Sequence, residues 1–261
     1  MRTCLPFRLL WLVLLACLPP VAAVGQTRGI DVSKYQGTID WAKVAKSKKV
    51  SFVYVKATEG TSIQDPYYAS NVKKARAAGL PVGSYHLYSG RTTAQQQFAN
   101  FKSVVKKSQQ DLIPVLDIEE RVSRNLDMKR VDKLLQLMEK EYGCKPMIYT
   151  SESVYLTRFA VKKYAAYQFF IANYRRFPRA RHTLWQFTQT GRVRGISGYV
   201  DISEMKKGRK VADIRMPSKK KKKKKEAAAS SEREEAETPT PKEDKERGKG
   251  DNRGDGAGFD W

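Results

Sequence analysis

Between residues 28 and 203 this chain alternates short apolar runs with longer segments in which apolar residues recur every three to four positions. Short apolar runs are typical of buried strands, and the longer pattern predicts helices with one apolar face. Strands that alternate with helices form parallel sheets in which each helix crosses over from one strand to the next. The alternation therefore predicts an α/β fold built on parallel strands.

The pattern predicts eight strands and four helices. The strands are expected at 28–32, 51–57, 81–88, 112–119, 146–150, 168–173, 183–188 and 199–203, and the helices at 39–45, 66–78, 92–107 and 126–142. Gly79 and Gly143 follow the second and fourth helices, at the position where glycine commonly ends a helix. Eight strands favour a closed barrel, although the last three are too close in sequence to leave much room for helices between them.

The first 25 residues have the layout of a signal peptide. Arg2 and Arg8 flank the start of an apolar run that is too short to span a bilayer, and small residues at 21–23 offer a cleavage site. A second interpretation is lipid attachment at Cys17, because residues 14–17 resemble a lipobox, although the apolar residues that follow argue against it. Both interpretations predict export to a secreted, periplasmic or envelope-associated location.

The three cysteines predict a fold held together by its core. Cys4 and Cys17 lie in the leader, so Cys144 is alone in the mature chain and has no partner for an internal disulfide.

The charge balance predicts an anionic partner. The net charge is +23, and residues 28–205 alone hold 30 basic against 15 acidic residues. A basic exported protein is suited to cell-wall polymer or lipid head groups. Nucleic acid is not expected as a partner, because export separates the protein from the usual nucleic-acid targets and the chain has no recognised nucleic-acid motif.

From residue 206 onward the composition changes. The run Lys219–Lys225 is followed by residues rich in Glu, Ala, Ser and Pro, which cannot bury enough apolar surface to fold. We expect a signal peptide at 1–25, a single catalytic barrel at 28–205 and a disordered basic tail at 206–261. The lysine run is a candidate contact to an anionic envelope polymer or a membrane surface.

The predicted strand 112–119 ends in two carboxylates, Asp117 and Glu119. Because side chains alternate along a strand, both point to one face, with Val115 beneath them and Ile118 on the opposite face. Two such carboxylates are the minimum for cleaving a glycosidic bond, one as the acid and one as the anion. The simpler interpretation is two surface acids at the end of a strand.

In a parallel barrel, ligands bind where the strands end. The polar and aromatic residues expected there are Asp31, Lys56, Glu59, Tyr85, His86, Tyr88, Asp117, Glu119, Tyr149, Asn173, Tyr174, Trp185, Gln186 and Asp201. Carboxylates on the first, fourth and eighth strands converge if the barrel closes, and aromatic rings beside them suit the C–H faces of sugars. We expect His86 to serve as a structural hydrogen-bonding residue.

Five stretches in this order resemble the motifs of the glycoside hydrolase family 25 lysozymes. They are residues 29–37 with 39–41, 55–60, 79–86, 115–119, and 184–187 with 193–201. The resemblance covers the whole predicted folded body. Phe170 and Leu87 depart from the family pattern, in which tryptophan and phenylalanine are usual.

The resemblance implies an irregular TIM-like (β/α)5(β)3 barrel that cleaves the β-1,4 bond between N-acetylmuramic acid and N-acetylglucosamine in peptidoglycan. It implies that Glu119 is the general acid/base and Asp117 its partner, with Asp31 and Asp201 as supporting acids. The substrate-binding residues are then expected to be Tyr35, Glu59, Tyr85, Tyr149, Trp185 and Gln186. No metal or other cofactor is implied, and we expect a monomer that acts on peptidoglycan glycan strands.

Three routes remain open for Asp117: orienting the substrate's own acetamido group as nucleophile, forming an aspartyl intermediate, or assisting an inverting water. A different class of function also remains open. In that alternative the chain is a non-catalytic peptidoglycan-binding envelope protein anchored by its basic tail.

Overall fold

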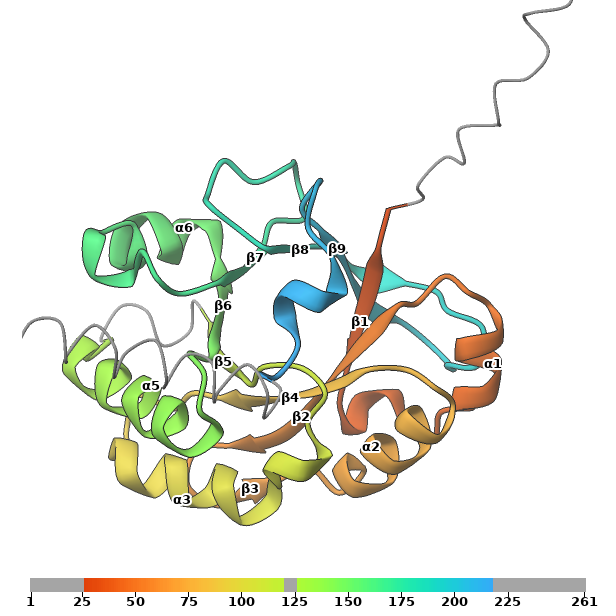
Figure 1. The fold of residues 1–261 in the computed structure, drawn as a ribbon, viewed down its shortest axis with the longest axis horizontal. Helices are drawn as coiled ribbons and strands as arrows, with labels where there is room; N and C mark the ends of the chain where they lie inside the picture. Colours follow the sequence, from red (N-terminus) through yellow and green to blue (C-terminus); the bar gives the residue numbers. More distant parts are fainter. Residues whose placement is uncertain (1–25, 120–125, 218–261) are drawn as a thin grey trace, which may run out of the picture. The chain divides into compact units, whose positions relative to one another are not determined.

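Eight strands of the computed structural model close into a barrel (Figure 1). The structure describes residues 26–119 and 126–217, so the predicted leader at 1–25, Glu120 and the lysine run lie outside the described residues. The strands follow the order β1, β2, β4, β5, β6, β7, β8, β9 around the ring, and β9 pairs with β1 to close it. Their bounds are β1 Arg28–Val32, β2 Phe52–Glu59, β4 Val82–Leu87, β5 Val115–Ile118, β6 Met147–Ser151, β7 Phe169–Ala172, β8 Leu184–Gly191 and β9 Val200–Met205.

The last strand runs against the others. Strands β1 to β8 pair in parallel around the ring, whereas β9 is antiparallel to both β8 and β1. The expectation of parallel strands is therefore wrong for β9. The physical reason is the short connection: an antiparallel strand needs only a tight loop, whereas a parallel one needs a long crossover.

The helices cover the outside of the barrel along the first five strand–helix units. They are α1 Trp41–Lys46, α2 Tyr68–Ala77, α3 Ala94–Val104, α5 Met128–Tyr142 and the short α6 Glu152–Val154, which continues as a π-turn over Tyr155–Phe159. Gly79 and Gly143 have φ angles of 83° and 72°, which is the left-handed conformation that ends a helix without a Cβ clash. Five strand–helix units followed by three strands give the (β/α)5(β)3 architecture that the sequence predicts. The two-residue strand β3, Ile63–Gln64, which pairs with β2, is an addition to that prediction.

Two separate apolar layers hold the barrel. One lies between the strands and the helices, and the other fills the barrel interior with Phe52, Tyr54, Val115, Met147 and other side chains. Glycine makes room for the largest of these rings, because a Cβ at residue 83 would lie 2.3 Å from the ring of Tyr54. Large and small residues therefore alternate inside the barrel, as its closed geometry requires.

The folded body extends beyond the expected boundary at residue 205. A short 3-10 turn, η5 Val211–Ile214, follows β9, and Ile214 is fully buried in the interior layer at the end of the barrel where the strands begin. Arg215 forms an isolated bridge with Leu112. Apolar Val211, Ile214 and Met216 interrupt the basic residues here, and the compact unit that contains the barrel extends to Met216.

Among the described residues, no helix has the length and apolar character needed to cross a membrane.

Candidate active site

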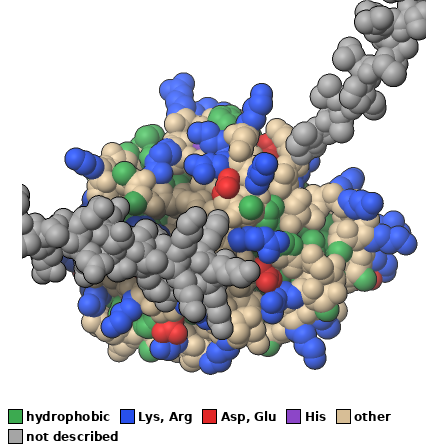
Figure 2. Space-filling view, viewed as in Figure 1, with side chains coloured by type: hydrophobic (Ala, Val, Ile, Leu, Met, Phe, Trp, Pro, Cys, Tyr) green, Lys and Arg blue, Asp and Glu red, His purple; other side chains and the backbone are tan. Residues whose placement is uncertain are grey.

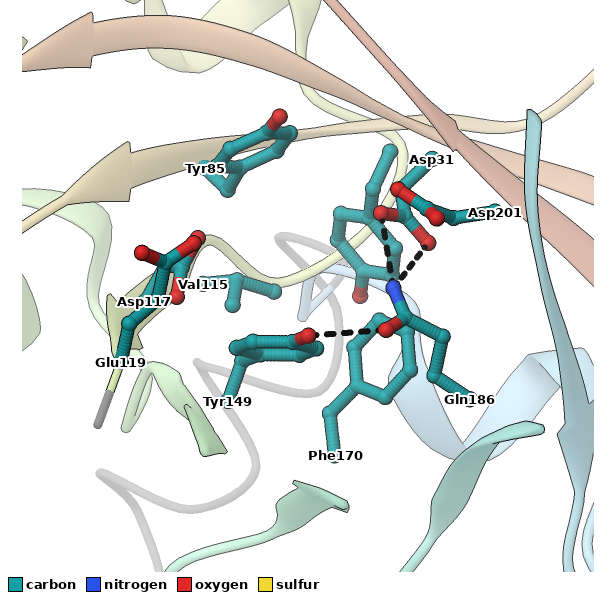
Figure 3. Close-up of a pocket in the computed structure, with 10 residues that line it drawn as sticks. Asp31, Tyr85, Val115, Asp117, Glu119, Tyr149, Phe170, Gln186 and Asp201 are labelled. Carbon is teal, nitrogen blue, oxygen red and sulfur yellow. Dashed lines mark hydrogen bonds between the residues drawn. The ribbon is translucent and has the colours of Figure 1, made fainter. Parts of the chain in front are cut away.

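Four carboxylates converge at the end of the barrel where the parallel strands finish. Asp31 comes from β1, Asp117 and Glu119 from the end of β5, and Asp201 from β9, and all four line one cavity of about 80 Å³. Figure 3 shows Asp117 and Glu119 on one side of this cavity, with Asp31 and Asp201 across from them. The other residues that line it are Tyr54, Tyr85, Val115, Tyr149, Phe170 and Gln186.

The end of β5 carries the first pair of acids. Val115, Asp117 and Glu119 face the cavity, whereas Ile118 is fully buried in the layer beneath the helices. Asp117 is only 8% exposed, and its position is fixed by strand pairing because it lies beside Leu87 of β4 and Tyr149 of β6. A rigid strand therefore holds the carboxylate pair.

The second pair of acids meets across β1 and β9. Asp31 and Asp201 are direct partners in the antiparallel register, and their side chains share a hydrogen bond. The sequence pattern predicts Asp201 at the carboxyl end of a parallel strand. It lies near the start of β9, and it reaches the same rim because β9 runs in the opposite direction.

Burial, together with nearby negative charge, raises the pKa values of both acids. Burial, followed by the negative charge of Asp201, raises the pKa of Asp31 well above its ordinary value. Burial raises the pKa of Asp201 to about 6. Because two close carboxylates cannot both ionise easily, the pair retains a proton at pH values where a free aspartate has lost it.

Gln186 connects this acid pair to two tyrosines. Its Nε2 donates to Oδ1 and Oδ2 of Asp31 at 3.0 and 3.1 Å. Its Oε1 accepts from the hydroxyl groups of Tyr149 at 2.8 Å and Tyr174 at 2.6 Å. All four contacts fit one orientation of the amide, so Gln186 fixes the hydroxyl of Tyr149 above the cavity floor (Figure 3).

Glu119 lies where this small cavity opens into two larger ones. A cavity of about 570 Å³ on one side is lined by residues of β6, α6 and the start of the β7–β8 loop, and one of about 400 Å³ on the other is lined by residues of β1, β2 and β4. Among the described residues, Glu119 alone lines all three. A long polymer lying across the rim would therefore pass directly over this carboxyl group.

A buried carboxylate shapes the larger cavity. Glu152, 6% exposed, accepts hydrogen bonds from Asn173 Nδ2 at 2.8 Å and from the backbone N–H groups of Ala180 and Arg179, and Arg176 lies 2.8 Å away. Although burial opposes ionisation, these backbone donors and the arginine lower the pKa of Glu152. Glu152 thereby fastens both ends of the β7–β8 loop, which carries Tyr174.

Most of the predicted substrate-binding residues lie on these cavities. Tyr85, Tyr149 and Gln186 line the small cavity, and Tyr35 and Glu59 line the one of about 400 Å³. Lys56 joins them, since a bulge in β2 turns both Lys56 and Glu59 inward and their side chains pair at 2.8 Å.

Trp185 is the exception. Leu184 and Gln186 point into the barrel, so alternation along β8 turns Trp185 to the outside, where it lines a different cavity. His86 also faces outward, where it lies buried against Phe101 of α3 and its ring contacts Thr58 and Gln97, and burial lowers its pKa to about 4. The expected structural role of His86 agrees with this position.

Tyr54 and Phe170 line the small cavity but were not among the predicted site residues, whereas Tyr174 was expected at a strand end without a specific role. Tyr174 reaches Gln186 from a loop, and Tyr54 and Phe170 form the wall below the acids. Tyr54 has the same face as Lys56 by strand alternation, which is a signal in the sequence. No pattern indicated how far the loop would bring Tyr174.

Within the described ranges, no group of three or more His, Cys, Asp or Glu side chains is arranged to hold a metal ion.

Comparison with known families agrees with this geometry. The model of the glycosyl hydrolases family 25 matches residues 30–196, which is more than half of the chain. This chain belongs to glycosyl hydrolase family 25. It is accordingly a glycoside hydrolase, and its fold is that of the family.

Curated relatives and solved structures extend the likeness. A protein of Escherichia coli K12 described as "Uncharacterized protein YegX" is 39% identical over 185 residues, 67% of this chain and 68% of that protein. Lysozyme M1 of Streptomyces globisporus is 33% identical over 196 residues, 67% of this chain and 66% of that protein.

Two solved structures share the barrel. A family 25 glycosyl hydrolase from Bacillus anthracis has a TM-score of 0.64 at 28% identity and covers 71% of this chain and 90% of its own. A lysozyme from Streptomyces coelicolor has a TM-score of 0.64 at 29% identity and covers 73% and 96%. The family match ends at residue 196, so the placement of Asp201 rests on the pairing of β9 with β1.

Proposed function

We propose that this family 25 hydrolase is an exported muramidase that cleaves the β-1,4 bond between N-acetylmuramic acid and N-acetylglucosamine in peptidoglycan. The observation that carries the proposal is the position of Glu119, beside Asp117 and at the meeting point of three cavities. The relatives named lysozymes support the substrate.

In this mechanism Glu119 is the general acid. Its protonated carboxyl group donates the proton to the bridging oxygen as the bond from that oxygen to the sugar C1 breaks. After the first product leaves, the same group, now a carboxylate, takes a proton from the attacking water.

We assign to Asp117 the orientation of the substrate's acetamido group. The cavity of about 80 Å³ next to Asp117 is sized for so small a substituent, and Tyr85 and Tyr149 form its sides. The acetamido oxygen attacks C1 to form a cyclic intermediate, Asp117 stabilises the positive charge that develops on its nitrogen, and water then reopens the ring with retention of configuration. An aspartyl intermediate and an inverting water are the alternatives that product stereochemistry distinguishes.

Asp31 and Asp201 then act as supporting acids that carry a shared proton and fix Gln186. Tyr35, Glu59, Tyr85, Tyr149 and Gln186 contact the glycan along the groove. Trp185 has no part in this groove.

A reducing-end assay on purified peptidoglycan tests the proposal, with mass spectrometry to identify the cleaved bond. We expect Glu119→Gln to lower kcat by about 10²- to 10⁴-fold, because the amide has no proton to give at this position. Undiminished release of muropeptides by this variant would rule out Glu119 as the acid. Wild-type protein that sediments with the wall but releases no reducing ends would instead support the non-catalytic binding alternative.

We also propose that residues 1–25 direct export and that the Lys219–Lys225 run attaches the enzyme to an anionic envelope polymer or membrane surface. Because the compact unit that contains the barrel extends to Met216, the truncation that tests the tail removes 218–261. Hydrolysis of soluble glycan should survive this deletion while envelope attachment falls. Equal attachment with and without the tail would show that the tail has no such role.

A further inference from the structure

The outer face of β8 lacks the helix that covers most other strands of the barrel. Helices α2, α3 and α5 pack over β2, β4 and neighbouring strands, whereas residues 173–183 and 192–199, all within the described part, contain no helix. Figure 1 shows the consequence, since only loops lie over β8 and β9. Trp185 and Phe187, which point outward from β8, are therefore only half-buried.

Three aromatic rings form a row on this uncovered face. Trp185 packs against Phe177 edge-to-face, with ring centroids 5.1 Å apart, and against Phe187 in a tilted arrangement at 5.6 Å. Phe177 is 58% exposed. Trp185 and Phe187 are half-buried, and Arg28 lies over the ring of Phe187 at 5.3 Å from its centroid. The exposed ring of Phe177 beside Trp185 is the kind of surface that suits the C–H faces of sugar rings.

Beside this row is a cavity of about 490 Å³ with a basic edge. Phe177, Trp185 and His182 form one wall, and the segment after β9 brings Lys206, Lys207 and Arg209 to the other. The one acid there, Glu204, is already paired with Arg28 at 3.2 Å. Lys206 and Lys207 form no ion pair with any described residue, so the cavity has an excess of positive charge. Figure 2 shows Lys and Arg side chains gathered over this part of the surface.

His182 supplies a second, independent feature of a built site. It is only 5% exposed, and its Nδ1 lies 2.7 Å from the carbonyl oxygen of Ala180. A carbonyl only accepts, so Nδ1 carries the proton. Burial and the nearby Lys206 lower the pKa of the ring, which is therefore neutral at pH 7 and leaves Nε2 as an acceptor.

This Nε2 atom is buried and has no partner among the described residues. An unpaired buried acceptor is unfavourable, so its retention fits a donor brought by a ligand. Phe177 packs edge-to-face against this ring, with the two ring centroids 5.1 Å apart, and 58% of its surface is exposed. A ligand that displaces Phe177 slightly would reach Nε2 with a hydroxyl or amide N–H group.

We propose that the outer face of β8 is a second glycan-binding site, which holds a carboxylate-bearing, N-acetylated glycan strand while the rim of the barrel cuts. Aromatic rings receive the sugar, His182 accepts from its amide or hydroxyl, and the lysines pair with carboxylates of the lactyl groups or stem peptides. None of the residues that line this site lines the cavities around Glu119. The identity of the glycan rests on the proposed muramidase function.

The test compares an insoluble wall with a short soluble glycan. In the full chain, Phe177→Ala removes an exposed ring without opening the core. Leu156→Ala, at a position that is 57% exposed and lines none of the four cavities, is the matched control. We expect Phe177→Ala to lower hydrolysis of insoluble peptidoglycan about 5- to 10-fold. We expect kcat/KM on a soluble tetrasaccharide, which occupies the rim alone, to stay within twofold.

A binding measurement separates this inference from the proposed function. Binding is measured by sedimentation with intact peptidoglycan in a Glu119→Gln background. Adding Phe177→Ala, or the double change Lys206→Gln/Lys207→Gln, should weaken this binding 5- to 10-fold. On glycan stripped of its peptides and lactyl groups, the lysine change should have no effect. If the parent enzyme cuts neither substrate but this binding pattern holds, the proposed function fails and the second site stands. Unchanged binding in the Phe177→Ala variant, or an equal fall on both substrates, overturns the second site.

Discussion

Replacing Gln186 by methionine tests whether one amide organises the candidate site. Gln186 is 2% exposed and takes part in four hydrogen bonds, two to Asp31 and two from tyrosines. Methionine has nearly the same length and shape but neither a donor nor an acceptor of comparable strength. The change therefore removes the hydrogen bonds while keeping most of the packing.

The expected loss follows from which partners can turn to water. Tyr174 is 47% exposed, so its hydroxyl group finds solvent at little cost. Tyr149 and Asp31 lie deeper, and each loses a bond worth about 1 kcal/mol or leaves a group unsatisfied at about 1–3 kcal/mol. We expect the free energy of unfolding to fall by about 2–4 kcal/mol, and Tm by roughly 4–16 °C for a folded body of this size.

Urea denaturation at pH 7 measures this loss as a shift in midpoint at constant m-value. Gln189→Met, on the exposed side of the same strand, is the matched control and should change stability by less than about 0.5 kcal/mol. Tyr149→Phe removes the hydroxyl group that Gln186→Met leaves without a partner. The double variant Gln186→Met/Tyr149→Phe should therefore lose about 1 kcal/mol less stability than the sum of the two single losses. A loss below 1 kcal/mol in Gln186→Met, or strict additivity in the double variant, would refute the network.

Three further outcomes follow from the same structure. Gly83→Ala should destabilise the fold by about 1–3 kcal/mol in thermal unfolding, because the new Cβ would overlap the Tyr54 ring at 2.3 Å, and a native-like Tm would contradict the tight inner packing. Glu152→Ala should lower the free energy of unfolding by about 2–4 kcal/mol, because it leaves buried donors of the β7–β8 loop without an acceptor. The control Glu141→Ala breaks only a surface ion pair with Lys102 and should lower it by less than about 1 kcal/mol. Similar losses in the two variants would contradict the role of Glu152 in holding the loop. The pKa of Asp201 is raised from 3.8 to about 6 in the folded protein, so ionisation of this group destabilises the fold increasingly as the pH rises through that range. Asp201→Asn should therefore be more stable than wild type by roughly 1–2 kcal/mol at pH 7, but not at pH 4. Unfolding curves of the two proteins at both pH values check this, and a difference that is largest at pH 4 would reverse the sign of the argument.

Local patterns predict the strands and the first carboxylate pair because both depend on residues close in sequence. The run from Val115 to Glu119 specifies a strand and the face of each side chain, and the structure agrees. The close spacing of the last three predicted strands also indicates that no long helices lie between them. The direction of β9 does not follow from the sequence, because an apolar run contains no information about which way it pairs.

The errors arise where three-dimensional context decides. The sequence offers Trp185 and Gln186 as neighbours at a strand end, but only one of two consecutive residues can face the barrel, and the choice is fixed by the register with β7 and β9. The basic residues Lys206, Lys207, Arg209 and Lys210 obscure the few apolar residues that follow them, so the sequence does not indicate that Ile214 is buried. Ile214 reveals its role only once the open end of the barrel is present to receive it.

The antiparallel course of β9 also brings the end of the barrel back to its beginning. Glu204 is paired with Arg28, and the backbone N–H of Met205 donates to the carbonyl of Thr27 at 2.9 Å. The first and last strands of the ring are therefore adjacent, and a circular permutant would need a linker from the residues after η5 back to the start of β1, with the chain opened elsewhere, for example at the exposed turn around Gly79. Circular permutants of this kind would place new termini far from the cleft and allow cargo to be attached on a chosen side of the enzyme.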